Sequence, residues 1–493
     1  MLLDKVCERT SKYLGEVNKA ERKVLGQFFT SIETAKYMAS FCQYQSDTAR
    51  ILDPGAGSGI LSVAIIERLI QRGLCKSISL VCYENDKRII TLLRKNLNDA
   101  KKYCEKNQVF FSYKILVVNF ITSNKGKNGG DFDIVICNPP YKKISRKSEE
   151  AIAMEEIIHG QPNLYFLFMA MALSLLRLGG EYIFIVPRSW TSGLYFFAFR
   201  KRFFANIDIS SIHLFVSRDK VFKRENVLQE TMILYGIRDN SFQRELILIS
   251  TSDGSADFDQ TEHLYAKKEA CFQPCNGRYL FLPSNDGELK TLKYINSFQA
   301  SVEERGYKFK TGRVVDFRNK EFLHETNIPH TCPLIWPVNF QNGEIKHPIE
   351  NAEKQYISID CKSVLMVDQD YLLVKRFTSK EEKRRLQPAI YKTKSRKVGQ
   401  FISTENHLNY LTKKHGEITD CELHGFFVLL SSTLWDQYYR ILNGSTQVNA
   451  AELNSMPIPP IKDICEMGHM ALTRRALTTS ECDSILEDYY EGR

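Results

Sequence analysis

The chain has 493 residues, a formal net charge of +9 at pH 7 and a hydrophobic content of 43%. This length predicts about two to four domains, and the ordinary composition excludes a largely disordered chain or a fibrous rod. The 13 cysteines extend from Cys7 to Cys482 without an apolar leader before them, so the sequence predicts reduced thiols in a cytoplasmic protein. The apolar stretch from Leu164 to Leu176 is too short to cross a bilayer, so we predict no membrane span.

Strands and helices alternate through the first half of the chain. Ile51 to Asp53 is a short apolar strand that runs into a glycine-rich turn. The hydrophobic periodicity then predicts helices at 60–71, 86–106 and 164–178, the last one ending at Gly179 and Gly180, and strands at 77–83, 111–118, 132–137, 181–186, 211–216 and 230–237. Such alternation predicts an α/β fold, a doubly wound and Rossmann-like parallel sheet.

The pattern changes after about residue 240. Helical periodicity weakens, and short strands, prolines and glycines become common. We therefore predict a first domain at 1–240 and a mixed α+β second domain at 241–493, with an aromatic-rich helix at 425–442 and a helical tail. Residues 374–397 hold ten Lys or Arg and two Glu, which is +8 of the net charge of +9. Such a cluster suits a phosphate backbone, and it also suits a solvated helix face with Glu–Lys pairs.

The glycine-rich turn and the end of the next strand indicate a nucleoside cofactor. The turn reads Asp53-Pro54-Gly55-Ala56-Gly57-Ser58-Gly59 and lies between a strand and a helix. Glycines there let the backbone approach a ligand closely. Dinucleotide sites have a similar turn, but the acidic Asp53 inside the motif and the absence of the P-loop pattern favour S-adenosylmethionine. Glu84 ends the following strand, where a carboxylate can accept both ribose hydroxyls.

The most informative feature is the tetrapeptide Asn138-Pro139-Pro140-Tyr141, which follows the predicted strand at 132–137. The two prolines end that strand and fix the loop. The side-chain oxygen of Asn138 and the main-chain oxygen of Pro139 can then bind both hydrogens of a planar exocyclic amine, which frees its lone pair for attack on a sulfonium methyl. Tyr141 offers an aromatic face to the base.

With these motifs, the sequence resembles the S-adenosylmethionine-dependent adenine-N6 methyltransferases of DNA. The segment Gly26-Gln27-Phe28-Phe29-Thr30 resembles the cofactor-side motif of that family, which implies that Phe28 and Thr30 contact the cofactor. Asn119-Phe120 stands where the family usually has Asp and Phe, which implies a contact with the cofactor's adenine. Phe222 stands where an aromatic residue packs on the target base. A buried core Phe is the alternative for that position.

The resemblance extends into the second half, which is similar to type II modification methylases of the PstI and BsuBI group in segments such as LIWPVNF at 334–340 and GSTQVNAAELNSMPIPP at 444–460. It implies methylation of one adenine, flipped out of double-stranded DNA, in a short palindrome such as CTGCAG. It also implies a second domain that recognises the target, a monomer, and a separate restriction endonuclease as partner. Four cations of the basic cluster are then candidate DNA contacts: Arg376, Lys383, Arg384 and Arg385.

Other functions share part of this pattern. The same tetrapeptide occurs in similar enzymes that methylate glutamine side chains of proteins or guanine-N2 of RNA, and these remain the alternative. Cytosine-N4 enzymes more often begin the motif with Ser or Asp, and the only Pro-Cys pair, Pro274-Cys275, is out of order for carbon-5 chemistry. Cys271, Cys275 and His263 make a weak case for a metal, so we predict no metal site.

Overall fold

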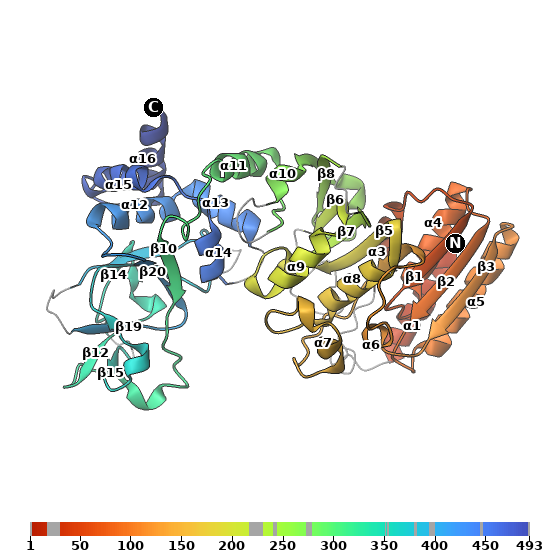
Figure 1. The fold of residues 1–493 in the computed structure, drawn as a ribbon, viewed down its shortest axis with the longest axis horizontal. Coiled ribbons are helices and arrows are strands. Elements are labelled where there is room, and N and C mark those ends of the chain that lie inside the picture. Colours follow the sequence, from red (N-terminus) through yellow and green to blue (C-terminus); the bar gives the residue numbers. More distant parts are fainter. Residues whose placement is uncertain are drawn as a thin grey trace. The chain divides into compact units, whose positions relative to one another are not determined.

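The computed structural model describes residues 2–16, 30–215, 230–239, 244–272, 279–350, 352, 354–378, 382–393, 400–443 and 447–491. The chain divides into two compact units (Figure 1). The first unit comprises Met1–Phe272 and Leu282–Asn285, and the second comprises Gln273–Phe281 and Asp286–Arg493. Within the described ranges, every helix is too short or too polar to traverse a lipid bilayer.

The first unit contains a nine-stranded sheet in the order β3-β2-β1-β4-β5-β7-β6-β8-β9. The first five strands of that order are parallel, β7 is antiparallel to both of its neighbours, β8 is parallel to β6, and β9 is antiparallel to β8. The bounds are β1 Thr48–Asp53, β2 Ser77–Tyr83, β3 Phe110–Leu116, β4 Phe132–Cys137, β5 Leu176–Pro187, β6 Asp208–Phe215, β7 Thr231–Ile237, β8 Leu246–Ser252 and β9 Glu262–Lys267.

Helices cover both faces of this sheet (Figure 1). Their bounds are α1 Leu2–Glu16, α3 Ile32–Ser40, α4 Ile60–Arg72, α5 Ile90–Lys106, α6 Phe120–Ser123, α7 Glu149–Ala153, α8 Leu164–Leu175, α9 Phe197–Phe204 and α10 Lys268–Cys271. Ile183 and Ile185 of β5 belong to the core that includes α1, α3, α4 and α5. The alternate residue Tyr182 faces the other way, and its hydroxyl donates to the carbonyl of Met169 in α8 at 3.1 Å. The sheet is therefore doubly wound, as the sequence predicted.

Two predicted boundaries differ from the structure. Helix α8 ends at Leu175, and Gly179, with φ +77°, lies inside β5 where the register against β4 shifts. The glycines therefore form an irregularity in a strand and do not cap a helix. The first unit extends to residue 272, beyond the predicted boundary at 240, because β8 pairs with β6 and buries Ile247 and Ile249.

The second unit combines two small sheets with a group of helices, which is the mixed α+β class that the sequence predicted. The sheets have the orders β10-β20-β17-β18-β14-β13 and β11-β15-β12-β19-β16. The strands are β10 Tyr307–Thr311, β11 Leu323–His324, β12 Thr331–Ile335, β13 Phe340–Gln341, β14 Glu344–Ile345, β15 Tyr356–Ser358, β16 Met366–Val367, β17 Tyr371–Lys375, β18 Pro388–Tyr391, β19 Phe401–Thr404 and β20 Leu408–Lys413. The helices are α11 Asp286–Asn296, α12 Asp420–Ser431, α13 Thr433–Leu442, α14 Ala450–Ser455, α15 Ile461–Leu472 and α16 Thr479–Glu491. The single helix predicted at 425–442 is divided between α12 and α13 at Ser432, whose hydroxyl caps α13.

Candidate active site

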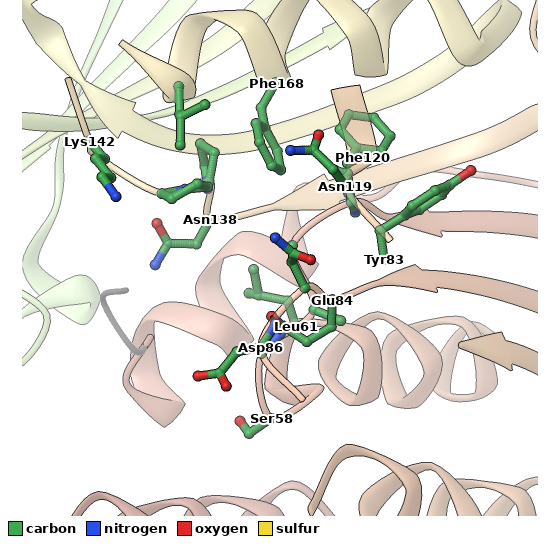
Figure 2. Close-up of a pocket in the computed structure, with 18 of the residues that line it drawn as sticks. Ser58, Leu61, Tyr83, Glu84, Asp86, Asn119, Phe120, Asn138, Lys142 and Phe168 are labelled. Carbon is green, nitrogen blue, oxygen red and sulfur yellow. Dashed lines mark hydrogen bonds between the residues drawn. The ribbon is translucent and has the colours of Figure 1, made fainter. Parts of the chain in front are cut away.

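A cavity of about 420 Å³ opens at the carboxyl ends of β1, β2, β3 and β4 in the first unit. Ligands of open parallel sheets bind at this edge, and the volume falls within the range of about 300–1,000 Å³ that is usual for small-molecule sites. Figure 2 shows Asn119, Phe120 and Tyr83 at one end of the cavity and Asn138 and Lys142 at the other. The remaining lining comes from Thr30, Pro54–Ser58, Ile60, Leu61, Glu84–Arg88, Val118, Pro139, Pro140, Glu150, Leu164 and Phe168.

The glycine-rich turn between β1 and α4 forms the floor of the cavity. Gly57 and Gly59 have φ values of +53° and +82°, a region that side chains other than glycine's rarely tolerate. A Cβ atom on Gly59 would also lie 2.8 Å from Cδ1 of Leu93. The turn therefore needs glycine for its conformation and for its close packing on α5, and Gly55 and Gly57 line the cavity.

Asp53 lies beneath this turn with no exposed surface. Its Oδ2 accepts a hydrogen bond of 2.6 Å from the hydroxyl of Ser62 in α4. Burial raises the pKa of Asp53 to about 7, against the opposing effects of the Ser62 hydroxyl and the Gly55 backbone N–H. Asp53 does not line the cavity formed by the described residues. Its hydrogen bond with Ser62 instead connects the start of the turn to α4.

Glu84 ties the glycine turn to the end of β2. Its Oε2 accepts the backbone N–H of Gly57 at 2.8 Å, and its Oε1 accepts that of Asp86 at 2.8 Å. Burial raises the pKa of Glu84, and the two backbone N–H groups oppose this shift. Each carboxylate oxygen has two lone pairs, so these bonds leave capacity for hydroxyl donors inside the cavity.

The Asn138-Pro139-Pro140-Tyr141 loop follows β4 at the opposite end of the cavity. Asn138, Pro139 and Pro140 line it, and Nδ2 of Asn138 donates to Oγ1 of Thr30 at 3.1 Å. This bond holds the Asn138 side chain against Thr30, with the amide nitrogen directed at the hydroxyl. The hydroxyl of Tyr141 donates to the carbonyl of Ile185 in β5 at 3.0 Å, and its ring packs against the first unit's core.

An aromatic slot occupies the end of the cavity near β3. The ring of Phe120 lies 5.0 Å from that of Tyr83 and 5.1 Å from that of Phe168. Asn119 caps α6 by accepting two backbone N–H groups, and its Nδ2 donates to Oε1 of Glu150 at 2.8 Å. Sequence reasoning missed Phe168 and Glu150, because Phe168 reads as part of a buried apolar helix and Glu150 belongs to no motif.

The remaining predicted residues fall into two groups. Phe28 and Phe222 lie outside the residues that the structure describes. In the second unit, Arg376 is half-buried and donates to the carbonyl of Asn406 at 3.1 Å, whereas Lys383 is exposed.

Arg384 and Arg385 are a correction to the predicted DNA contacts. Arg384 donates to the carbonyls of Leu430 at 3.0 Å and Ser432 at 2.8 Å, which close the end of α12. Arg385 has no exposed surface, and its guanidinium lies 5.8 Å from the centre of the Tyr439 ring. Both side chains support the packing of the second unit, so the structure contradicts a phosphate contact for them. A cluster of charges in the sequence does not reveal which members fold inwards.

The comparisons with known proteins identify the family of this chain. Residues 61–222 match the family described as "Eco57I restriction-modification methylase". The chain is 32% identical over 468 residues to the type II methyltransferase M.PstI of Providencia stuartii, covering 93% of this chain and 91% of that one. It is 33% identical over 488 residues to M.BsuBI of Bacillus subtilis, covering 96% of this chain and 94% of that one. The chain belongs to the type II methyltransferases of the PstI and BsuBI group.

This type II DNA methyltransferase also shares its fold with a more distant solved structure. The cryo-EM structure of a DrdV–DNA complex has a TM-score of 0.50 and 12% identity, and the match covers 95% of this chain and 59% of that one. Membership of the group assigns S-adenosylmethionine as the methyl donor and restriction-modification as the context. The glycine turn, the Glu84 carboxylate and the aromatic slot suit the amino-acid, ribose and purine parts of such a cofactor. The described residues contain no cluster of three or more His, Cys, Asp or Glu side chains arranged for a metal ion.

Proposed function

We propose that this methyltransferase transfers a methyl group to the N6 amine of an adenine in double-stranded DNA. The observation that carries the proposal is the position of Asn138. Its amide is oriented by Thr30 at the rim of the same cavity that holds the glycine turn and Glu84. An acceptor pair at that rim suits an amine held in line with a methyl donor bound along the cavity.

The chemistry of the tetrapeptide follows from the weakness of the nucleophile. An exocyclic amine on a purine delocalises its lone pair into the ring. The Asn138 side-chain oxygen and the Pro139 carbonyl accept its two hydrogens and favour a more tetrahedral nitrogen with a localised lone pair. S-adenosylmethionine supplies a methyl carbon activated by a sulfonium. The nitrogen–carbon bond forms as the carbon–sulfur bond breaks, and the surplus amine proton passes to water.

Tyr141 is the proposed stacking surface for the target base. Its hydroxyl donates to the carbonyl of Ile185, which fixes the ring in the same loop as Asn138. The adenine has to leave the duplex to reach this loop, because its N6 amine is paired inside the helix.

A basic segment directly after the tetrapeptide supports a DNA substrate. Residues 142–147 read Lys-Lys-Ile-Ser-Arg-Lys, with four cations and no acid. Lys142 lines the cavity, and Lys143 and Lys147 are exposed. The Arg146 guanidinium donates to the carbonyls of His159 and Gly160, both at 2.9 Å, which anchors the segment. Cations beside the catalytic loop can neutralise the phosphates that flank a flipped nucleotide.

We further propose that the second unit recognises the target sequence, with Arg376 and Lys383 as candidate contacts, and that CTGCAG is the palindrome to test first. Its similarity to M.PstI and M.BsuBI continues through this unit. We also propose that the protein acts as a monomer, separately from a cognate endonuclease. For a palindrome, two independent visits by a monomer suffice to modify both strands.

Modified-base sequencing tests this function. DNA from a methylation-free host that expresses the wild-type protein should carry N6-methyladenine at one short palindrome. DNA from the same host with Asn138→Ala should carry none, although the purified variant still binds S-adenosylhomocysteine. Methyl groups on cytosine, on a protein glutamine or on an RNA guanine would overturn the proposal, and so would undiminished methylation by Asn138→Ala.

A further inference from the structure

The aromatic end of the cavity contains a polar pair, of which the sequence motifs identified Asn119 but not Glu150. Asn119 and Glu150 both line the cavity next to Phe120 and Phe168. The two residues are 31 positions apart and are joined by the 2.8 Å hydrogen bond from Nδ2 of Asn119 to Oε1 of Glu150. An apolar, aromatic end of a cavity with a polar pair beside it suits a heterocycle that carries hydrogen-bonding groups on one side.

The oxygen of Asn119 is already committed. It accepts the backbone N–H groups of Ile121 at 3.0 Å and Thr122 at 3.2 Å, which caps α6. An amide oxygen has two lone pairs, so these two bonds use its capacity. Asn119 can therefore offer a ligand only the second hydrogen of its NH₂ group, which is a donor.

The two other carboxylates in the cavity lining already accept hydrogen bonds, and the remaining acceptor capacity of Glu84 suits the ribose hydroxyls. Glu84 accepts backbone N–H groups from Gly57 and Asp86, both at 2.8 Å. Asp86 accepts the Arg88 guanidinium at 2.9 Å on each of its two oxygens. Glu150 is half-buried and receives the Asn119 amide on Oε1, which leaves acceptor capacity on the same carboxylate.

The pair thus places a donor from Asn119 beside an acceptor from Glu150. This pattern is complementary to the Watson–Crick edge of adenine, where N1 accepts a hydrogen bond and the N6 amine donates one. We propose that Glu150 accepts a hydrogen bond from the exocyclic amine of the cofactor's own adenine, and so makes the site specific for adenosine over other purine nucleosides. The inference rests on the cofactor cavity and does not depend on which base of DNA is methylated.

Binding measurements with two ligands test this role without catalysis. S-adenosylhomocysteine and S-inosylhomocysteine differ at the purine edge. Inosine carries a carbonyl in place of the amine, and its N1 bears a hydrogen and is a donor instead of an acceptor. The wild-type protein should bind the adenosine ligand about tenfold or more tightly than the inosine ligand, since a hydrogen bond to a charged group contributes this much. Isothermal titration calorimetry of both ligands gives the ratio directly.

Glu150→Gln should weaken binding of S-adenosylhomocysteine about tenfold or more and lower the adenosine-to-inosine ratio, because a glutamine amide can donate to the inosine carbonyl. Glu149→Gln is the matched control. It alters the neighbouring exposed carboxylate of the same helix, and it should leave both dissociation constants unchanged.

Each outcome gives a distinct answer. Unchanged binding by Glu150→Gln overturns the proposal, and so does an equal loss for both ligands, which would mean a general effect on the cavity. Failure of the wild-type protein to bind S-adenosylhomocysteine, or equal affinities of the wild-type protein for the two ligands, also overturns the proposal. The base that is methylated is read separately by sequencing, so a failure of the adenine-N6 proposal remains distinguishable.

Discussion

Replacing Thr30 with valine separates two roles for that residue. The resemblance to known methyltransferases implies that Thr30 contacts the cofactor, whereas the structure shows its hydroxyl accepting the Nδ2 proton of Asn138 at 3.1 Å. Valine has nearly the same shape as threonine but lacks the hydroxyl. Thr30→Val therefore removes this restraint on the Asn138 amide, whose oxygen then spends less time facing the target amine.

The expected effect follows from the loss of one hydrogen bond between neutral groups. Such a bond contributes about 0.5–1.5 kcal/mol, which corresponds to a decrease of about two- to tenfold in the rate of methyl transfer. The side chain of Thr30 is buried, with 7% of its surface exposed, so solvent offers little compensation. Because the bond orients a group that acts on the target amine, the affinity for S-adenosylhomocysteine should be unchanged.

The assay is a single turnover with saturating DNA and cofactor, combined with calorimetry of S-adenosylhomocysteine. Thr30→Ser is the matched control because it keeps the hydroxyl, and it should retain most of the wild-type rate. A normal transfer rate for Thr30→Val would refute the positioning role. Weaker cofactor binding with a normal rate would instead establish Thr30 as a cofactor contact.

Three further predictions concern DNA binding and stability. Lys143→Gln combined with Lys147→Gln should weaken DNA binding and reduce the slope of log affinity against log salt by about 0.9 for each phosphate that the variant no longer neutralises. Arg385→Ala should lower the free energy of unfolding by about 2–5 kcal/mol in urea titrations, because the side chain is fully buried. The pKa of Asp53 is raised from 3.8 to about 7, so the folded state binds its proton more tightly than the unfolded state does. Its contribution to stability is lost as the pH rises through this window, and Asp53→Asn should flatten that part of the stability–pH curve.

Controls keep these predictions specific. Lys101→Gln with Lys102→Gln alters two exposed lysines of α5 away from the cavity, and it should leave the salt slope unchanged. An unchanged slope for the variant at 143 and 147 would remove the basic segment from the DNA surface. Exposed Lys383→Ala should change stability by less than about 0.5 kcal/mol, and an equally small effect of Arg385→Ala would contradict the buried role. A wild-type pH profile for Asp53→Asn would show that Asp53 is ionised throughout this range.

Local sequence was sufficient to predict the parts of the site that depend on backbone geometry. The glycine turn after β1, Glu84 at the end of β2 and Asn138 at the end of β4 all line the cavity. Their positions follow from a single rule, because the carboxyl ends of parallel strands meet at one edge of the sheet. The identity of each residue type was then enough to suggest its chemistry.

The sequence was a poorer guide wherever the outcome depended on which side chains fold inwards. Lys383, Arg384 and Arg385 are adjacent and all cationic, yet Lys383 is exposed whereas Arg385 has no exposed surface. The boundary at 240 was wrong for a similar reason. Strands β8 and β9 complete the first unit's sheet through pairings that no local pattern reveals.

By itself, the sequence determined the class of fold, through the alternation of strands and helices, and the methyl donor, through short contiguous motifs. Only the tertiary structure decided that Asp53 lies beneath the cavity, that Thr30 orients Asn138, and that Asn119 is joined to Glu150. Partners 31 or 108 positions apart are brought together by the packing of the sheet and its helices. A hydrogen bond requires its two partners to be positioned to within a few tenths of an ångström. A linear pattern of residue types does not contain that information.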